Sequence, residues 1–203
     1  MQGARAIGAG LAALLWVVMG AASARAEADF MTVGLSTTVP IGHHLFCQEH
    51  REDCTRKAGV AAGPLKLDTA LITKVAAINT AINAAIEPLS DLLQYGVEER
   101  WSYPGAKGDC EDYVLVKRRQ LHAAGIPLED LLITVVRKTN GEGHAVLTLH
   151  TTAGDFVLDN LDWRVKPWRD TPYTFVKRQN ALDPTDWLSI NEAVDVATSA
   201  VGR

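Results

Sequence analysis

The first long hydrophobic pattern in the chain is helical. Between residues 65 and 86 apolar side chains recur with a period of 3.6, and Pro88 follows. This predicts one amphipathic helix, with a shorter helical piece at 89–95. Asn79 and Asn83 lie one turn apart on the long helix, and we expect them at its exposed polar edge; lining a cleft is the alternative. The apolar positions are Leu67, Leu71, Val75, Ile78, Ile82 and Ile86.

The second half of the chain carries a β pattern. Residues 131–138 are almost continuously apolar, and 144–151 and 155–161 follow after short turns that contain glycine. These runs predict an antiparallel meander of three strands, to which 174–178 adds a returning strand. Residues 29–46 are β-prone and rich in turn formers, so we expect them to wrap the domain. The predicted fold is therefore α+β, with helices packed on an antiparallel sheet.

A cysteine opens the helix that lies between these two patterns. Within 101–125 the Pro- and Gly-rich turn ends at Asp109, a good N-cap, so the helix is predicted to begin at Cys110 and to stop at Gly125. Unpaired N–H groups and the positive end of the helix dipole favour a thiolate there. A buried structural cysteine is the alternative. The solvated face of this helix is expected to carry Lys117, Arg118 and Arg119.

The strands downstream supply a histidine and an aspartate. His144 begins one predicted strand and Asp159 lies on the next, so a nucleophile, a base and an orienting acid occur in the chain order of a thiol acyl-transfer enzyme. If the hairpin pairs Thr151 with Gly154, Asp159 falls opposite Val146, within diagonal reach of His144. A slip of one residue would turn Asp159 to the other face. Taken singly, the two residues are typical of a surface histidine and a strand-end cap.

An oxyanion would form in this reaction, and it needs donors. The backbone N–H of Cys110 is the first donor by position. The indole of Trp101 and the hydroxyl of Tyr103 are the candidates for the second donor. Packing in the core is the alternative role for Trp101.

The start of the chain has the pattern of a targeting segment. Residues 1–26 combine a basic start, an apolar stretch rich in alanine, and an Ala-x-Ala motif at 24–26, as secretory signals do. The stretch is short for a membrane span. We therefore expect a periplasmic or secreted product with one domain over 27–203; an uncleaved anchor is the alternative.

The charge balance excludes one class of partner. The 20 Lys and Arg residues include Arg5 and Arg25, so a processed chain keeps 18 against 24 Asp and Glu. A mildly acidic chain without a basic stripe is a poor nucleic-acid binder. No motif for an organic cofactor occurs in the sequence.

Two further cysteines lie close together near the N-terminus. Cys47 and Cys54 stand in a segment with three histidines, HHLFCQEHREDC. A disulfide suits an oxidising compartment and would leave Cys110 as the free thiol. Zinc binding and unpaired thiols are the alternatives, although the spacing matches no standard zinc finger.

Three acids crowd the proposed nucleophile. Asp109, Glu111 and Asp112 put negative charge beside Cys110, which raises a thiol pKa and disfavours the thiolate. Acids in the first turn of a helix are also ordinary capping residues. Several carboxylates at a turn are, however, the ligands that a hard divalent cation prefers. A bound Ca²⁺ would offset the charge and fix the helix start.

Four sequence blocks carry a family resemblance: GDCEDYVLVKRRQL, GEGHAVLTLHT, GDFVLDNL and PYTFVKRQ. Together they resemble the bacterial transglutaminase-like cysteine peptidases, which include LapG-type periplasmic proteases of large surface adhesins. The resemblance covers about 46–190. It implies a papain/transglutaminase-like fold with Cys110 as nucleophile, His144 as base and Asp159 as orienter. It also implies a structural role for the Cys47 and Cys54 pair.

The resemblance extends to a cation and to partners. LapG-type relatives depend on calcium through acids in the same block, which points to Asp109 and Glu111 as ligands, with Asp112 less firmly implied. The implied partners are a protein substrate such as a surface adhesin and an inner-membrane sensor that regulates the enzyme. We therefore expect a periplasmic cysteine endopeptidase. Transglutaminase acyl transfer to an amine and a catalytically idle calcium- or partner-binding module are the alternatives.

Overall fold

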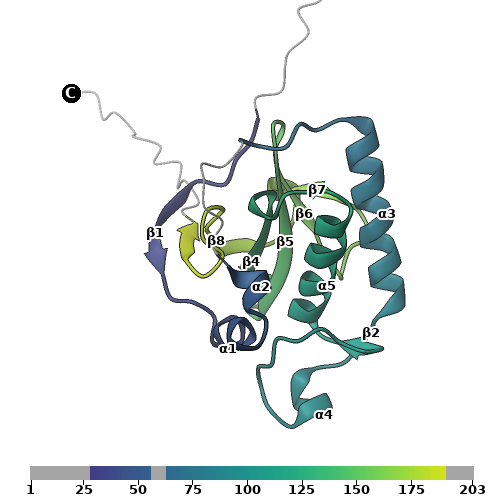
Figure 1. Cartoon of the computed structure of the whole chain (residues 1–203), viewed down its shortest axis with the longest axis vertical. Coiled ribbons are helices and arrows are strands. Elements are labelled where there is room, and N and C mark those ends of the chain that lie inside the picture. The colour runs from purple at the N-terminus through teal and green to yellow at the C-terminus, as the bar shows by residue number, and fades with distance from the viewer. Residues whose placement is uncertain (1–27, 56–62, 191–203) are drawn as a thin grey trace, which may run out of the picture.

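The computed structural model describes residues 28–55 and 63–190, which form a seven-stranded antiparallel sheet with helices over one face (Figure 1). The strand order is β1-β9-β8-β4-β5-β6-β7, and β2 and β3 form a separate parallel pair. The α+β fold predicted from the sequence is confirmed. Its helices are α1 (Ile41–Glu49), α2 (Arg51–Cys54), α3 (Thr69–Ala85), α4 (Asp91–Tyr95) and α5 (Cys110–Ala123), with single 3₁₀ turns at Leu128–Asp130 and Trp168–Asp170. Its strands are β1 (Val33–Thr37), β2 (Glu87–Pro88), β3 (Lys107–Gly108), β4 (Leu131–Arg137), β5 (Gly143–Thr151), β6 (Gly154–Leu158), β7 (Lys166–Pro167), β8 (Thr174–Gln179) and β9 (Trp187–Ile190).

The β5–β6 hairpin has the register that the sequence predicts. Thr151 pairs with Gly154, and the ladder runs to Leu147 opposite Leu158, where β6 ends. Strand β5 continues beyond that point with β4 alongside it, as Val136 pairs with His144. This is the first part of β5, residues 143–146, and none of the described strands pairs with its other edge. These four residues are the open stretch of β5, and α5 contacts this strand.

Helix α3 follows the predicted periodicity. The Asp68 side chain caps it by accepting a hydrogen bond of 2.8 Å from the Leu71 N–H, and Pro88 lies just beyond its end. The predicted apolar positions Val75 and Ile82 are buried. One expectation is wrong, because Asn79 is fully buried rather than at an exposed edge.

Helix α5 lies in the middle of the domain. It packs on β5 with one side and against α3 with another, as Figure 1 shows. A helix between two layers has two buried sides, which explains why Lys117 and Arg118 are buried and only Arg119 of the basic run is exposed. The predicted solvated face is therefore wrong for Lys117 and Arg118. Arg118 donates to the main-chain oxygens of Leu131 and Asp53, both at 3.1 Å.

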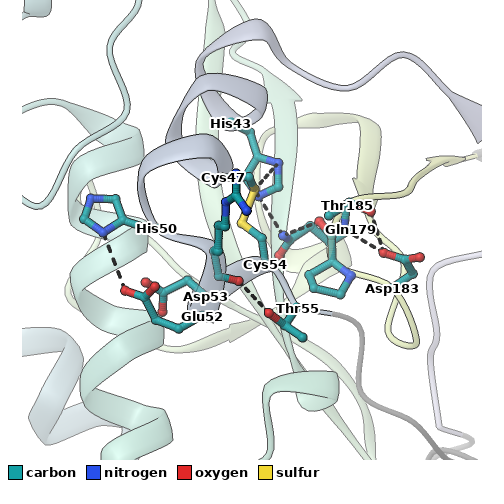
Figure 2. Close-up of a disulfide and its surroundings, with 12 residues drawn as sticks. His43, Cys47, His50, Glu52, Asp53, Cys54, Thr55, Gln179, Asp183 and Thr185 are labelled. Carbon is teal, nitrogen blue, oxygen red and sulfur yellow. Dashed lines mark hydrogen bonds and ion pairs between the residues drawn. A yellow bond between two sulfur atoms is a disulfide. The ribbon is translucent and has the colours of Figure 1, made fainter.

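The predicted β-prone segment 29–46 contains β1, but it becomes helical from Ile41, where α1 begins, and α2 follows it. Cys47 in α1 and Cys54 in α2 are joined by a disulfide, with His43 beside it, as Figure 2 shows. The zinc alternative is excluded because the two sulfurs bond each other and are not free thiolates. Helix α1 packs on Trp101 through Gly42, where a Cβ would lie 2.2 Å from the indole Cδ1. Only glycine allows that approach.

The predicted signal segment, 1–26, lies outside the described residues. Among residues 28–55 and 63–190, none of the helices combines the length and the apolar character needed to cross a bilayer.

Lys117 gives a test of this packing. Burial lowers the pKa of Lys117 to about 7, although the charge of Asp159 opposes the shift. An unfolded lysine titrates near about 10.4. Between about pH 7 and pH 10 the unfolded state therefore binds more protons, and this residue makes stability rise with pH.

We predict that Lys117→Met removes most of that rise and stabilises the protein at pH 7, because it takes out of the core an amino group that has no hydrogen-bond partner among the described residues. Urea unfolding at about pH 7 and about pH 9.5 measures both effects. Lys74→Met, which changes an exposed lysine, is the matched control and should keep the wild-type difference. An equal rise in Lys117→Met and wild type would contradict the assignment.

Candidate active site

Cys110 is the first residue of α5, as predicted, and it is a free cysteine. The chain enters the helix through Gly108, where a Cβ would lie 2.5 Å from a carboxylate oxygen of Asp112. The Ala145 N–H in β5 lies close enough to the Cys110 sulfur to lower the pKa of the thiol. The sulfur therefore lies against the part of β5 that no described strand covers on that side.

His144 is the residue before Ala145, and it pairs with Asp159. Its Nε2 lies 2.9 Å from Asp159 Oδ1, and the two side chains are only 4% and 5% exposed. The hairpin pairs Thr151 with Gly154, as the sequence predicts, and its ladder ends at Leu147 opposite Leu158, so Asp159 is the first residue beyond β6. Because Nε2 faces the carboxylate, Nδ1 is the ring nitrogen left to exchange a proton with another group.

Several donors fix the carboxylate of Asp159. The Leu161 N–H donates to Oδ1 at 3.0 Å, and the Tyr173 hydroxyl donates to Oδ2. The Asn83 side chain holds the main-chain oxygen of Asp159 at 2.8 Å. Burial alone would raise the pKa of Asp159, but the hydrogen bonds from His144, Leu161 and Tyr173 bring it below its usual range. The carboxylate is therefore ionised at neutral pH and held in one orientation.

Two of these contacts were not predicted as parts of the site. The sequence placed Asn83 at a polar edge, but with Asn79 it braces the segment that follows β6, since Asn79 donates to the Trp163 main-chain oxygen at 3.0 Å. Tyr173 begins the quoted block PYTFVKRQ after its proline, and that block was the only sign of its role. The pairing of distant segments, which one sequence does not reveal, brings these side chains to Asp159.

The thiol lies in an unfavourable electrostatic environment. Burial raises the pKa of Cys110 well above its usual range, and the nearby Glu111 carboxylate raises it further; only the Ala145 N–H lowers it among the main causes. Cys110 Sγ lies 3.0 Å from Glu111 Oε2 and can donate to it. The acids beside the nucleophile therefore oppose the thiolate, as expected from the sequence, unless their charge is offset.

Three carboxylates converge beside the nucleophile. Asp91, Asp109 and Glu111 each offer an oxygen, and these oxygens lie within 4.8 Å of one another. Burial and the charge of Asp109 raise the pKa of Glu111 to about 8. Oδ1 of Asp91 and Oδ1 of Asp109 are buried and have no hydrogen-bond partner among the described residues. Such a group suits a hard divalent cation.

The structure adds a fourth acid, Asp91, to the three acids expected from the sequence. Asp109 and Glu111 belong to the group of three, but Asp112 does not. Asp112 Oδ1 instead accepts hydrogen bonds from the main-chain N–H and the hydroxyl of Ser102, at 2.9 and 3.3 Å. Asp112 Oδ2 is buried and has no hydrogen-bond partner among the described residues. Asp91, which opens α4, lies 18 residues before Asp109, so the sequence motif did not include it.

The side chains proposed as a second oxyanion donor are engaged elsewhere. The Trp101 indole N–H donates to Glu99 at 2.7 Å, and its ring is buried in the core. The Tyr103 hydroxyl donates to Asp53 at 2.9 Å. Trp101 therefore has the packing role that was the alternative, and the Cys110 backbone N–H remains the donor assigned by position.

The chain is similar to known proteins in sequence and in structure. The family model described as bacterial transglutaminase-like cysteine proteinase, BTLCP, matches residues 33–195. EGTA-treated LapG of Legionella pneumophila has a similar structure, with a TM-score of 0.50 and 23% identity over 62% of this chain and 70% of that chain. Calcium-bound LapG has a TM-score of 0.47 and 24% identity over 62% and 78% of the two chains. No curated protein sequence matched.

The His144–Asp159 pair predicts selective reactivity of the thiol. His144→Ala should slow alkylation of Cys110 by iodoacetamide at pH 7 by about tenfold or more, because the thiol loses its base. The rate is read by intact mass in buffer that contains calcium chloride. His150→Ala is the matched control, since His150 Nδ1 also pairs with a carboxylate, Asp155, at 2.6 Å but away from the thiol. Equal rates in both variants would contradict the pairing of His144 with Cys110.

Proposed function

Because the chain belongs to the bacterial transglutaminase-like cysteine proteinase family, and is therefore a cysteine peptidase, we propose that it is a periplasmic endopeptidase with Cys110, His144 and Asp159 as its catalytic triad. The observation that carries the assignment is the buried His144–Asp159 pair, which lies next to Ala145, the strand residue whose N–H lowers the pKa of the Cys110 thiol. The adjacent positions of His144 and Ala145 on β5 support a reaction between the free thiol and the oriented imidazole.

The reaction proceeds through a thioester. His144 Nδ1 takes the thiol proton, and the Cys110 sulfur attacks the carbonyl carbon of the scissile bond. The oxyanion that forms accepts a hydrogen bond from the Cys110 backbone N–H. The imidazolium then gives its proton to the leaving amine as the C–N bond breaks.

Water completes the cycle. His144 takes a proton from the water that attacks the thioester carbon, and returns it to the sulfur as the C–S bond breaks. Asp159 accepts from Nε2 throughout, which keeps Nδ1 directed at the reacting atoms and stabilises the imidazolium. It needs no proton of its own for this role.

A calcium ion fits the acidic group. Asp91, Asp109 and Glu111 would hold it, because an oxygen from each converges with the others. Asp91 and Asp109 also each have one buried oxygen without a hydrogen-bond partner among the described residues. When bound, the ion supplies positive charge that offsets the three carboxylates beside the thiol. LapG of Legionella pneumophila has been solved both calcium-bound and EGTA-treated, which is in line with this proposal.

The substrate and location are further parts of the proposal. The likeness to LapG-type proteases favours a large surface adhesin as substrate and an inner-membrane sensor as regulator. The Cys47–Cys54 disulfide suits the oxidising periplasm that a cleaved 1–26 signal would lead to. A large tandem-repeat adhesin encoded beside this gene would support the substrate assignment.

Calcium binding can be tested by two matched substitutions. We predict that calcium chloride raises the Tm of the wild type and that Asp91→Asn abolishes most of this rise. Asp112→Asn should keep a saturable rise in Tm, because the Oδ1 of the asparagine still accepts a hydrogen bond from Ser102. Thermal unfolding of each variant with calcium chloride and with EGTA measures this change in Tm. A rise kept in Asp91→Asn and lost in Asp112→Asn would move the site to Asp112. No rise in the wild type would remove the site.

The reaction class can be tested with a peptide library and a labelled amine. We predict cleavage without added amine, with Cys110→Ser inactive because it removes the nucleophilic sulfur; mass spectrometry identifies the new termini. Incorporation of the amine without cleavage would show a transglutaminase instead. Neither reaction, together with an unreactive Cys110, would show an idle binding module.

A further inference from the structure

Tyr173 contacts both members of the His144–Asp159 pair. Its hydroxyl donates to Asp159 Oδ2, while His144 uses Oδ1. Its ring lies 5.5 Å from the His144 ring between centroids, at an interplanar angle of 57°. Tyr173 is the residue before β8, so it reaches His144 and Asp159 from a separate segment of the chain.

The two carboxylate oxygens of Asp159 have different partners. Oδ1 accepts from His144 and from the Leu161 N–H, whereas Tyr173 is the donor to Oδ2. The Asp159 side chain is buried, so loss of the phenol would leave Oδ2 without a hydrogen-bond partner among the described residues. The carboxylate could then rotate and present either oxygen to the imidazole.

The phenol is suited to this role over the whole working pH range. Burial raises the pKa of Tyr173, and the hydrogen bond to Asp159 raises it further. The hydroxyl therefore stays protonated and remains a donor. Its ring also limits how far the His144 ring can turn, because the two rings are in contact distance.

We propose that Tyr173 is a positioning residue of this active site, which fixes the carboxylate of Asp159 and through it the imidazole of His144. The proposal rests on the catalytic triad proposed above. Tyr173 acts on the reaction only through Asp159 and His144, so its effect depends on the presence of the Asp159 carboxylate.

The chain offers a matched control for the substitution. The Tyr103 hydroxyl donates to Asp53 at 2.9 Å. Burial raises the pKa of Tyr103, and this hydrogen bond raises it further, as at Tyr173. Tyr103→Phe therefore removes the same kind of phenol–carboxylate hydrogen bond at a place away from the His144–Asp159 pair. Both substitutions keep the ring, and circular dichroism and Tm confirm that each variant is folded.

The test is the rate of Cys110 alkylation by iodoacetamide with calcium chloride present. Tyr173→Phe is expected to lower the rate by about tenfold, as loss of a hydrogen bond to a charged group does. Tyr103→Phe should stay within about twofold of the wild type. In an Asp159→Asn background, Tyr173→Phe should cause no further loss, because residues that act as one unit are not additive.

A spectroscopic measurement separates positioning from general packing. In protein with ¹⁵N-labelled histidine, the proton resonance of the His144 Nε2–H should shift in Tyr173→Phe and stay in place in Tyr103→Phe. An unchanged resonance and alkylation rate in Tyr173→Phe would overturn the inference, as would an equal loss in the Asp159→Asn background. If wild-type Cys110 reacts no faster than N-acetylcysteine, the proposed triad fails instead.

Discussion

The contact between the start of α5 and the open stretch of β5 is the constraint on which the site depends. Strand β6 ends at Leu158, so β5 keeps His144 and Ala145 free on one side, and the helix start brings Cys110 to that position. The same ending lets the chain turn at Asp159 and present its carboxylate to His144. The register of the β5–β6 hairpin therefore sets the positions of both His144 and Asp159, and a shift by one residue would separate the two side chains.

Much of this arrangement could be predicted from sequence because it is local. The β5–β6 hairpin needs only alternating residues and a short turn, and α5 needs only an N-cap and an apolar period. The buried state of Lys117 could not be predicted, because it follows from α3 lying over a second side of α5. Likewise Asp91 and Tyr173 reach the site through tertiary packing, and single-sequence patterns carry no signal for such meetings.

The site combines two opposing electrostatic tendencies. Burial and the acids at the start of α5 raise the pKa of Cys110, while an oriented imidazole favours proton transfer from the thiol. The acids that oppose the thiolate are also the group best arranged to hold a cation. In the proposed enzyme these acids would thus keep the Cys110 thiol protonated and unreactive without the cation. Once a cation offsets their charge, the thiol could react.

Titration of the Cys110 thiolate, followed by its ultraviolet absorbance against Cys110→Ser as blank, tests the central claim most directly. With calcium present, the account predicts that the wild-type thiolate forms well below the pKa of about 8.5 of an ordinary cysteine. It also predicts that His144→Ala moves the titration to a higher pH. A wild-type thiol that titrates at or above the ordinary value, and does so equally without His144, would contradict the account.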